Sequence, residues 1–282
     1  MTVRSSRGAQ HRIALPAGAE LLSVSIDGTA QPVRAQPDGI VLPINPGAQK
    51  VDVRWRQADG MTGRFVSLAV DLGAPSVNAH LRVAVPPSRW ILFAGGPRLG
   101  PAVLFWSLLP VLALVAFGLG RVRSTPLRAH HWLPLGIGLT QVPVAAAVVV
   151  AGWLLALGWR GERGAALSPR AFDLVQLLLV GWTAVAIGIL FYAIQQGLLG
   201  QPDMQIAGNG SYAEVLRWYQ DRSAAVLPQA WVISTPLLVY RLLMLAWALW
   251  IAAALLRWLR WGWERFGSGG YWRGRREKPA AG

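Results

Sequence analysis

The sequence predicts a membrane all-α domain of four transmembrane helices that follows an N-terminal all-β, sandwich-like soluble domain. Four long apolar runs fill the C-terminal two thirds of the chain, and short alternating runs with turn residues fill residues 1–95. The composition agrees with this division, because the mean hydropathy is +0.39 and 54% of the residues are hydrophobic. Such values are typical of membrane proteins.

The N-terminal region, residues 1–95, is predicted to be a soluble β-rich head. Asp27-Gly28 and Pro37-Asp38-Gly39 are typical of turns, since glycine adopts positive φ and Asp bonds its own backbone. Six or seven strands at a spacing of about ten residues favour a β-sandwich, with an incomplete sheet as the alternative. The strands are expected at residues 13–15, 21–26, 39–44, 51–55, 65–70 and 81–85.

A linker at residues 96–101, rich in glycine and proline, separates the head from the predicted membrane domain at residues 102–266. Each apolar run has about the 20 residues that a helix needs to cross a hydrocarbon core of roughly 30 Å. Helices are expected because every backbone polar group inside that core must pair within its own segment. The predicted spans are residues 101–120, 133–157, 174–199 and 237–256.

The spans carry few polar groups. The first three contain no charged residue and the fourth contains only Arg241, whose burial would cost roughly 2.5–3.5 kcal/mol at a helix centre. Arg241 lies about one turn inside its span, so it either reaches the interface or contacts Asp173, Gln195 or Gln196 in a polar pathway. Pro143 is expected to kink the second span, with Gln141 nearby to satisfy the freed backbone groups.

The connection between the last two spans, residues 200–236, is expected to contain an interfacial helix near residues 211–222. Ser211 and Glu214 have the spacing of a capping box, which satisfies the first free N–H groups of a helix. A phosphate-binding loop at Gly208-Asn209-Gly210 is disfavoured, because no Lys follows the glycines.

The C-terminal residues 267–282 are predicted to form a basic flexible tail. The chain has 27 Lys and Arg against 13 Asp and Glu, a net charge of +14. Many cations follow the last span among tryptophans, so anionic lipid headgroups are favoured as partners over nucleic acid, at about 1 kcal/mol per cation. The expected headgroup contacts are Arg257, Arg260, Arg273, Arg275, Arg276 and Lys278.

Several short motifs are spread over the head and the loops of the predicted membrane domain. They are Arg4-Ser5-Ser6, His11, Leu15-Pro16, Asp27-Gly28, Pro46-Gly47, Trp55-Arg56, Asn78-Ala79, Arg89-Trp90, the run from Gly96 to Trp106, and Gly208-Asn209-Gly210-Ser211. Together they resemble the C-terminal part of a family of large uncharacterised envelope membrane proteins of proteobacteria. The resemblance implies a long extracytoplasmic β-rich portion ahead of the helices, and it implies no activity.

Candidate catalytic groups are scarce. Cysteine is absent, which excludes disulfides, thiolate metal sites and thiol nucleophiles. His130 and His131 are adjacent and would diverge around a helix, so a shared metal site is disfavoured. A membrane enzyme acting on a lipid-linked substrate would have only these histidines and Asp173 as candidates. We therefore expect no catalytic residue, no metal and no cofactor.

The sequence favours a non-enzymatic inner-membrane protein of bacteria that anchors an extracytoplasmic β-rich region through protein and lipid contacts. The alternative is a small oligomeric transporter-like module that uses the polar groups Arg241, Gln141, Gln195, Gln196 and Asp173.

The sequence alone leaves two membrane topologies open, an outward and an inward head, and four spans place both chain ends on one side. An outward head puts the basic loop after the first span in the cytoplasm but the basic tail outside, and an inward head reverses this. No apolar segment of a signal peptide follows Arg4 and Arg7, which favours an inward head. The resemblance favours a periplasmic head, which is the arrangement expected here.

Overall fold

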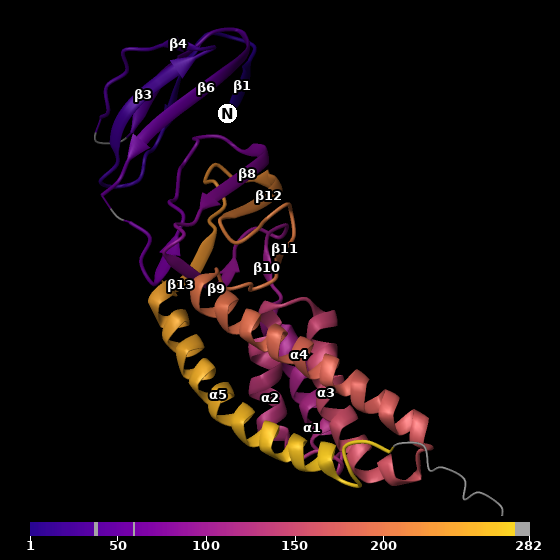
Figure 1. Ribbon diagram of the computed structural model, residues 1–282. Coiled ribbons are helices and arrows are strands. Elements are labelled where there is room, and N and C mark those ends of the chain that lie inside the picture. The colour runs from indigo at the N-terminus through magenta and orange to yellow at the C-terminus, as the bar shows by residue number, and fades with distance from the viewer. Residues whose placement is uncertain (37–38, 59, 274–282) are drawn as a thin grey trace, which may run out of the picture. The chain divides into compact units, whose positions relative to one another are not determined.

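The computed structural model describes residues 1–36, 39–58 and 60–273, and the chain forms two compact units (Figure 1). The first, called the β unit, contains Met1–Leu104 and Met204–Pro236. The second, called the helical unit, contains Phe105–Asp203 and Leu237–Gly282. The chain therefore leaves the helical unit after α4, builds part of the β unit, and returns to form α5.

The N-terminal part of the β unit contains two antiparallel sheets. One has the strand order β1-β6-β3-β4, and the other pairs β2 with β5. The prediction of a β-rich N-terminal region is confirmed. The strands are β1 (Thr2–Ser5), β2 (Ala9–Ile13), β3 (Glu20–Ile26), β4 (Thr29–Ala30), β5 (Ile40–Ile44) and β6 (Gly47–Arg56).

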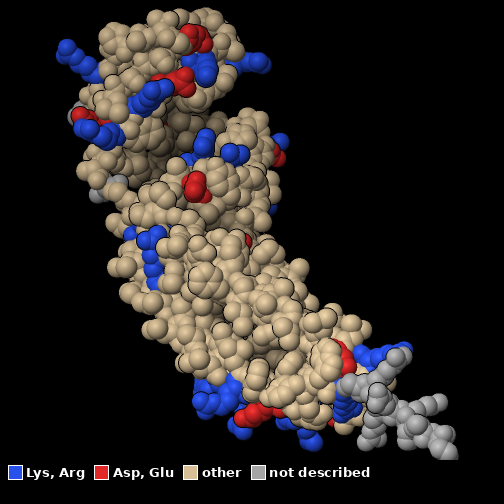
Figure 2. All heavy atoms as spheres, in the orientation of Figure 1, with Lys and Arg blue, Asp and Glu red and all other residues tan. Residues whose placement is uncertain are grey.

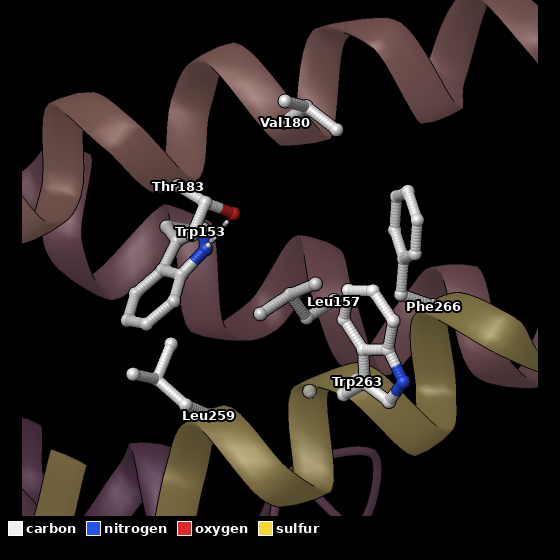
Figure 3. A pocket seen from close by; sticks show the side chains of 8 residues that line it. Trp153, Leu157, Val180, Thr183, Leu259, Trp263 and Phe266 are labelled. Atoms are coloured by element: carbon white, nitrogen blue, oxygen red, sulfur yellow. Dashed lines mark hydrogen bonds between the residues drawn. The ribbon is translucent and has the colours of Figure 1, made fainter. Parts of the chain in front are cut away.

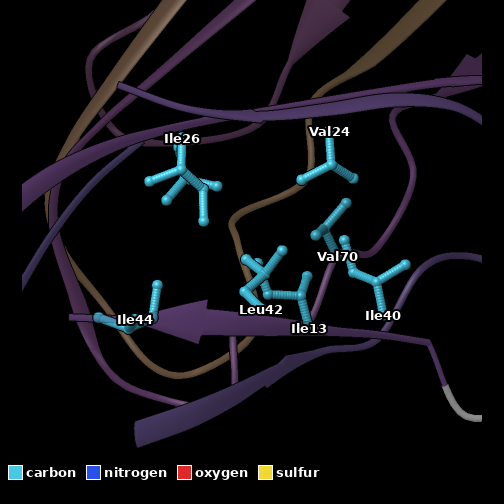
Figure 4. Packing of buried hydrophobic residues seen from close by; sticks show 8 residues of the cluster. Ile13, Val24, Ile26, Ile40, Leu42, Ile44 and Val70 are labelled. Carbon is cyan, nitrogen blue, oxygen red and sulfur yellow. The ribbon is translucent and has the colours of Figure 1, made fainter. Parts of the chain in front are cut away.

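The two sheets enclose an aliphatic core. Val24 and Ile26 of β3 point toward Leu42 and Ile44 of β5 (Figure 4). Alternation produces this core, because residues two apart on a strand face the same side of the sheet and Ile40, Leu42 and Ile44 are all buried. Branched aliphatic residues also fit a pleated, half-buried surface well.

A second core of the β unit combines segments that are distant in the sequence. Val83, Ile91, Leu216, Trp218 and Val232 are buried together. Three small antiparallel sheets surround them, with strand orders β12-β8, β7-β13-β9 and β10-β11. The strands are β7 (Arg64–Val66), β8 (Ser76–Ala84), β9 (Arg89–Gly95), β10 (Ala102–Val103), β11 (Ile206–Ala207), β12 (Val215–Ser223) and β13 (Trp231–Pro236).

The prediction of an interfacial helix near residues 211–222 is wrong, because β12 occupies most of this segment. The Ser211 hydroxyl does bond the backbone, but it accepts from the amide of Arg217 at 2.9 Å and so closes a turn. Leu216 and Trp218 are buried while Arg217 is exposed, which is the two-residue period of a strand. Residues 204–236 thus belong to the β unit and not to the membrane domain that was expected at 102–266.

The predicted linker at residues 96–101 packs into this second core. The carbonyl of Leu99 accepts a hydrogen bond from the amide of Tyr219 at 2.7 Å. Gly100 lies so close to the Trp218 indole that a Cβ at this position would overlap the ring. The segment is therefore part of the β unit and does not act as a free connection.

In the helical unit, α3, α4 and α5 are long and apolar enough to cross a membrane, and α1 is shorter. At 1.5 Å per residue, the 15 residues of α1 span only about 22 Å, less than a hydrocarbon core of roughly 30 Å. The helices are α1 (Phe105–Leu119), α2 (Ala129–Gly138), η1 (Leu139–Gln141), α3 (Val144–Arg163), η2 (Gly164–Ala166), α4 (Pro169–Leu199) and α5 (Leu237–Gly267).

The prediction of four spans is wrong, because the run at 101–120 forms only the 15-residue α1. The run at 133–157 also differs from the prediction, since it is not one helix. It ends α2, continues through η1, and begins α3 after Pro143. Val142, the residue before this proline, is extended, with φ −124° and ψ 161°. Proline disfavours the helical conformation in the preceding residue, so Pro143 separates two helices and does not merely kink one.

The two helices on either side of Pro143 run in opposite directions. Gly120, before α2, lies against Ala129 at its start, and Gly158, near the end of α3, lies against Ser124 in the same loop. The start of α2 and the end of α3 are therefore at the same end of the helical unit. The segment from α2 to α3 is a helical hairpin whose turn contains Pro143.

The remaining helices have directions fixed by side-chain contacts. Trp153 of α3 donates a hydrogen bond to the Thr183 hydroxyl of α4 at 2.9 Å, and Arg160 bonds Gln176, so α3 and α4 are antiparallel. On α5, Gly262 lies beside Leu157 and Arg265 beside Gly161, so α5 is parallel to α3. Consequently α3 and α5 finish, and α4 begins, at one end.

That end of the helical unit is called the arginine end, and the opposite end, where the chain passes to the β unit, is called the junction end. Arginines show as blue spheres at the bottom of Figure 2, where the helical unit finishes, and the surface before them is mostly tan. Within the part of the chain that the structure describes, the arginine end has three acidic residues, Glu162, Asp173 and Glu264, against ten arginines. These are Arg121, Arg123, Arg128, Arg160, Arg163, Arg170, Arg257, Arg260, Arg265 and Arg273.

Candidate functional site: an arginine-centred helix junction and an adjoining apolar pocket

Arg160, in the last turn of α3, is a cation with 0% of its surface exposed. Its Nε donates to Oε1 of Gln176 on α4 at 3.1 Å. Its Nη1 donates to the carbonyl of Ser268 at 2.9 Å, and its Nη2 donates to the carbonyl of Phe266 at 3.0 Å. The guanidinium therefore joins α3 and α4 to the end of α5.

The end of α5 supplies the hydrogen-bond acceptors that a buried guanidinium needs. The last carbonyls of a helix have no partner within the helix, and they carry partial negative charge from the aligned peptide dipoles. Arg160 also lies near the carbonyls of Arg265 and Gly270, at 3.4 Å each. The cation and the helix end thus satisfy each other without a carboxylate among these bonds.

Gln176 of α4 completes the junction. Its Nε2 lies 3.1 Å from the carbonyl of Phe266 and 3.3 Å from that of Tyr271, while its Oε1 accepts from Arg160. Gln176 is itself buried. A buried polar network is favourable only when each group has a partner, and the amide meets this condition on both of its ends.

Phe172 lies between two arginines at the start of α4. The guanidinium carbon of Arg160 is 4.3 Å from its ring centroid and that of Arg273 is 4.2 Å away. The amide of Arg273 donates to Oδ1 of Asp173 at 2.9 Å. These contacts hold the segment that follows α5 against α4, and cation–π attraction adds to the hydrogen bonds.

Chemically, the Arg160, Gln176 and Phe172 side chains of the arginine-centred junction bind and position neighbouring groups. Arg160 stays charged at any physiological pH, and glutamine and phenylalanine do not titrate. The junction therefore fits a structural role in holding three helices and the chain after α5 in one arrangement.

An apolar pocket of about 210 Å³ lies next to the junction, between α3, α4 and α5. Figure 3 shows its side chains pointing toward a common space from all three helices. The hydroxyl of Thr183 lies in the wall, but it already accepts from Trp153 at 2.9 Å and donates to the carbonyl of Leu179 at 2.7 Å. The lining residues are Trp153, Leu157, Val180, Thr183, Leu259, Gly262, Trp263 and Phe266.

The polar groups that could have formed a pathway are not brought together. Arg241 and Gln195 are exposed on the outside of the helical unit, and Gln196 donates to the Tyr192 hydroxyl at 2.9 Å. Gln141 accepts from the amide of Asp203 at 3.4 Å at the junction end. Asp173 is at the arginine end, 22 residues or about 33 Å of helix from Gln195.

The two histidines lie at the start of α2. The ring centroids of His130 and His131 are 4.1 Å apart, and Nδ1 of His131 accepts from the amide of Arg128 at 3.3 Å. Burial lowers the pKa of His131, and the nearby charges of His130, Arg257 and Arg128 lower it further. Among the described residues, no group of three His, Asp or Glu side chains is placed to hold a metal ion.

The predicted headgroup residues divide into three cases. Arg257 and Arg260 are exposed on α5. Arg273 is half-buried, and its Nη1 lies 3.3 Å from the carbonyls of both Ala165 and Leu167, so it belongs to the junction. The other three, Arg275, Arg276 and Lys278, lie outside the described residues.

Sequence reasoning missed Arg160, Phe172 and Gln176. Arg160 follows an apolar run and is close to Glu162 and Arg163, which is typical of a solvated helix end. Its partners are backbone carbonyl groups about one hundred residues later in the chain. Every residue has such a carbonyl, so the sequence does not reveal which ones Arg160 binds. The one available signal is a run of glycines, Gly158, Gly161 and Gly164, that permits close approach of a neighbour.

No family model, curated protein or solved structure matches this chain. The arrangement of the arginine-centred junction, the pocket and the two ends of the helical unit therefore carries the functional argument.

Proposed function

We propose that the chain is a multi-pass anchor in the inner membrane of a bacterium, with the β unit outside the cytoplasm and the arginine end inside it. In this role the helical unit holds a β-rich region at the extracytoplasmic surface for contact with protein partners of the envelope, and it performs no reaction. The proposal includes the periplasmic head expected from the sequence, but with a different number of crossings.

Strand pairing within the β unit supports the count of crossings. Trp218 of β12 lies opposite Leu81 of β8, and the pairing extends from Val215–Ala84 to Ser223–Ser76. Strands that exchange backbone hydrogen bonds must lie on the same side of a membrane. The chain between Leu104 and Met204 therefore crosses the bilayer an even number of times.

The helical hairpin supplies this even number. If residues 133–157 formed a single span, the chain would cross three times between Leu104 and Met204, and β12 could not reach β8. Because Pro143 reverses the chain, α3 and α4 cross as one pair, and α1 and α2 form a shorter pair of opposite direction that reaches the arginine end and returns. Both pairs return the chain to the side of the β unit.

One further crossing by α5 then places the arginine end and the tail opposite the β unit. Ten arginines gather at that end, whereas the junction end of the helical unit has Arg241 and Asp203. Positive residues near membrane spans are retained in the cytoplasm, so the distribution favours an external β unit. The conflict between the basic loop and the basic tail disappears, because the loop between α1 and α2 and the end of α5 both lie at the arginine end.

The anchoring role follows from how the β unit is built. Its second core takes strands from both sides of the helical unit in the sequence, so the polypeptide connects the two units at three points: after Leu104, after Asp203 and after Pro236. The β unit is therefore attached to the helical unit through three peptide connections, which suits an anchor.

Reporter fusions test the orientation. A reporter active only in the cytoplasm and one active only in the periplasm are each fused after Gly282, and the periplasmic reporter is also inserted at the exposed turn of Ser88. We expect cytoplasmic activity at Gly282 and periplasmic activity at Ser88. Activity of the periplasmic reporter at both positions would refute the proposed topology.

A further inference from the structure

We propose that the apolar pocket between α3, α4 and α5 holds one acyl chain of an anionic phospholipid, with the phosphate of that lipid at the arginine end. This proposal rests on the membrane placement given above and names a specific lipid site within it.

The pocket has the chemistry of an acyl-chain site. Its walls are side chains of Leu, Val, Phe and Trp, and its one hydroxyl, on Thr183, already makes two hydrogen bonds. A polar ligand would therefore lose its hydration without gaining a partner, at a cost of roughly 1–3 kcal/mol per group. The volume of 210 Å³ holds about seven methylene groups if each takes roughly the 30 Å³ of a liquid water molecule.

Aromatic residues indicate which end of the pocket would face the headgroup of the lipid. Trp263 at the pocket is 65% exposed, and its ring centroid is 6.2 Å from that of Phe266 and 5.7 Å from that of Tyr271. Tryptophan and tyrosine concentrate where the hydrocarbon meets the headgroups. The end of the pocket near these rings is thus where an acyl chain would join its glycerol and phosphate.

The local charge selects an anionic lipid. Arg260 is exposed on α5, between the pocket residues Leu259 and Trp263 in the sequence. Arg265 and Arg273 lie farther along the same segment, against Glu264 as the one acidic residue from 257 to 273. A phosphate with a net negative charge complements this end of the helical unit, and a zwitterionic headgroup does so less well.

A photoaffinity experiment tests the site in the full chain. The purified protein is placed in nanodiscs that contain phosphatidylglycerol with a photoreactive group in its acyl chain, and labelled peptides are identified after irradiation. We expect the label on the segments of α3 around 153–157 and of α5 around 259–266. Label spread evenly over the lipid-facing helices would overturn the proposal.

A matched pair of variants gives the control. Val180 lines the pocket and is 56% exposed, whereas Val185 is on the same helix, 55% exposed, and outside the pocket. Val180→Trp should reduce labelling of the pocket segments at least tenfold, and Val185→Trp should leave it within twofold. Equal labelling of the two variants would contradict an acyl-chain site. If Val180→Trp does not fold, the distribution of label over the helices of the unchanged protein tests the proposal instead.

The headgroup is tested with the same acyl label on phosphatidylcholine. We expect phosphatidylglycerol to label the pocket at least fivefold more strongly, and Arg260→Gln to reduce this preference. Equal labelling by both lipids would contradict the anionic specificity. Crosslinks from the pocket to a second copy of the chain would show a protein occupant and refute the proposal. A failure of the proposed topology would be detected separately, by the reporter fusions.

Discussion

Nε of Arg160 on α3 lies 3.1 Å from Oε1 of Gln176 on α4, and both residues bond the carbonyl of Phe266 at the end of α5. One carbonyl oxygen thus receives hydrogen bonds from two helices. This relationship makes the arginine-centred junction the polar contact that holds the three long helices together at the arginine end.

Removing the guanidinium should therefore destabilise the helical unit. In Arg160→Leu, the amide of Gln176 and the last carbonyls of α5 lose a charged donor, at roughly 1.5–3 kcal/mol for hydrogen bonds to a charged group. The measurement is the thermal unfolding of the purified protein in detergent, followed by circular dichroism at helical wavelengths. We expect a lower unfolding midpoint than that of the unchanged protein.

Arg163→Leu is the matched control, since Arg163 is on the same helix, one turn away, and exposed. An exposed arginine contributes within about 0.5 kcal/mol, so this variant should unfold close to the unchanged protein. If both variants have the same midpoint, Arg160 does not hold the helices together.

The helical hairpin makes a second prediction through Gly138 of α2. A Cβ at Gly138 would overlap the Trp247 indole, whose Nε1 donates to the carbonyl of Pro134 at 2.8 Å. Gly138→Ala should displace Trp247 from α2, and overpacking of this kind costs about 1–3 kcal/mol. In Gly136→Ala the new Cβ meets Leu112 at an ordinary 3.6 Å, so its detergent unfolding midpoint should stay higher than that of Gly138→Ala.

The second core of the β unit is tested at Gly100. Gly100→Ala would place a Cβ within the Trp218 indole, while Gly63→Ala meets only the carbonyl of Ser234 at 3.9 Å. The Trp218 side chain is 1% exposed and has little room to move. We expect Gly100→Ala to increase proteolysis between residues 204 and 236, and Gly63→Ala to leave the digestion rate unchanged. Identical digestion of the two variants would contradict the packing of the 96–101 segment against β12.

Arg241 gives a prediction of no effect. Its side chain is exposed near the start of α5, at the junction end, whereas Asp173 lies at the arginine end. Arg241→Leu should keep the protein in the membrane with an unchanged unfolding midpoint, since it breaks no hydrogen bond within the helical unit. A large loss of stability would show that Arg241 is buried against a partner, as a polar pathway requires.

The sequence predicted the apolar character of the spans well, because lipid exposure acts on composition and composition is local. It did not predict how the chain turns at Pro143. A proline in an apolar run either kinks a helix or ends it, and the choice depends on whether Trp247 and other distant residues pack against the separated pieces. Those contacts are 100 residues away and have no counterpart in the local pattern.

The helix prediction for the segment that forms β12 failed for a related reason. Ser211 and Glu214 have capping-box spacing, but a serine hydroxyl also satisfies backbone groups in turns, and the outcome depends on what the next residues can pair with. Here these residues pair with β8, which lies more than one hundred residues earlier in the sequence. Arg160 is the same case at the level of side chains, as its partners are backbone carbonyls.

The central claim is that the β unit and the arginine end lie on opposite sides of the membrane, and single cysteines test it directly. The chain has no cysteine, so Ala224→Cys in the β unit, Ser88→Cys in its other segment and Ser168→Cys between α3 and α4 each introduce a unique thiol. Intact spheroplasts are treated with a membrane-impermeant maleimide. We predict labelling at positions 88 and 224 without permeabilisation and at 168 only after it. Labelling of 88 and 168 from the same side, or of 88 and 224 from opposite sides, would contradict the account.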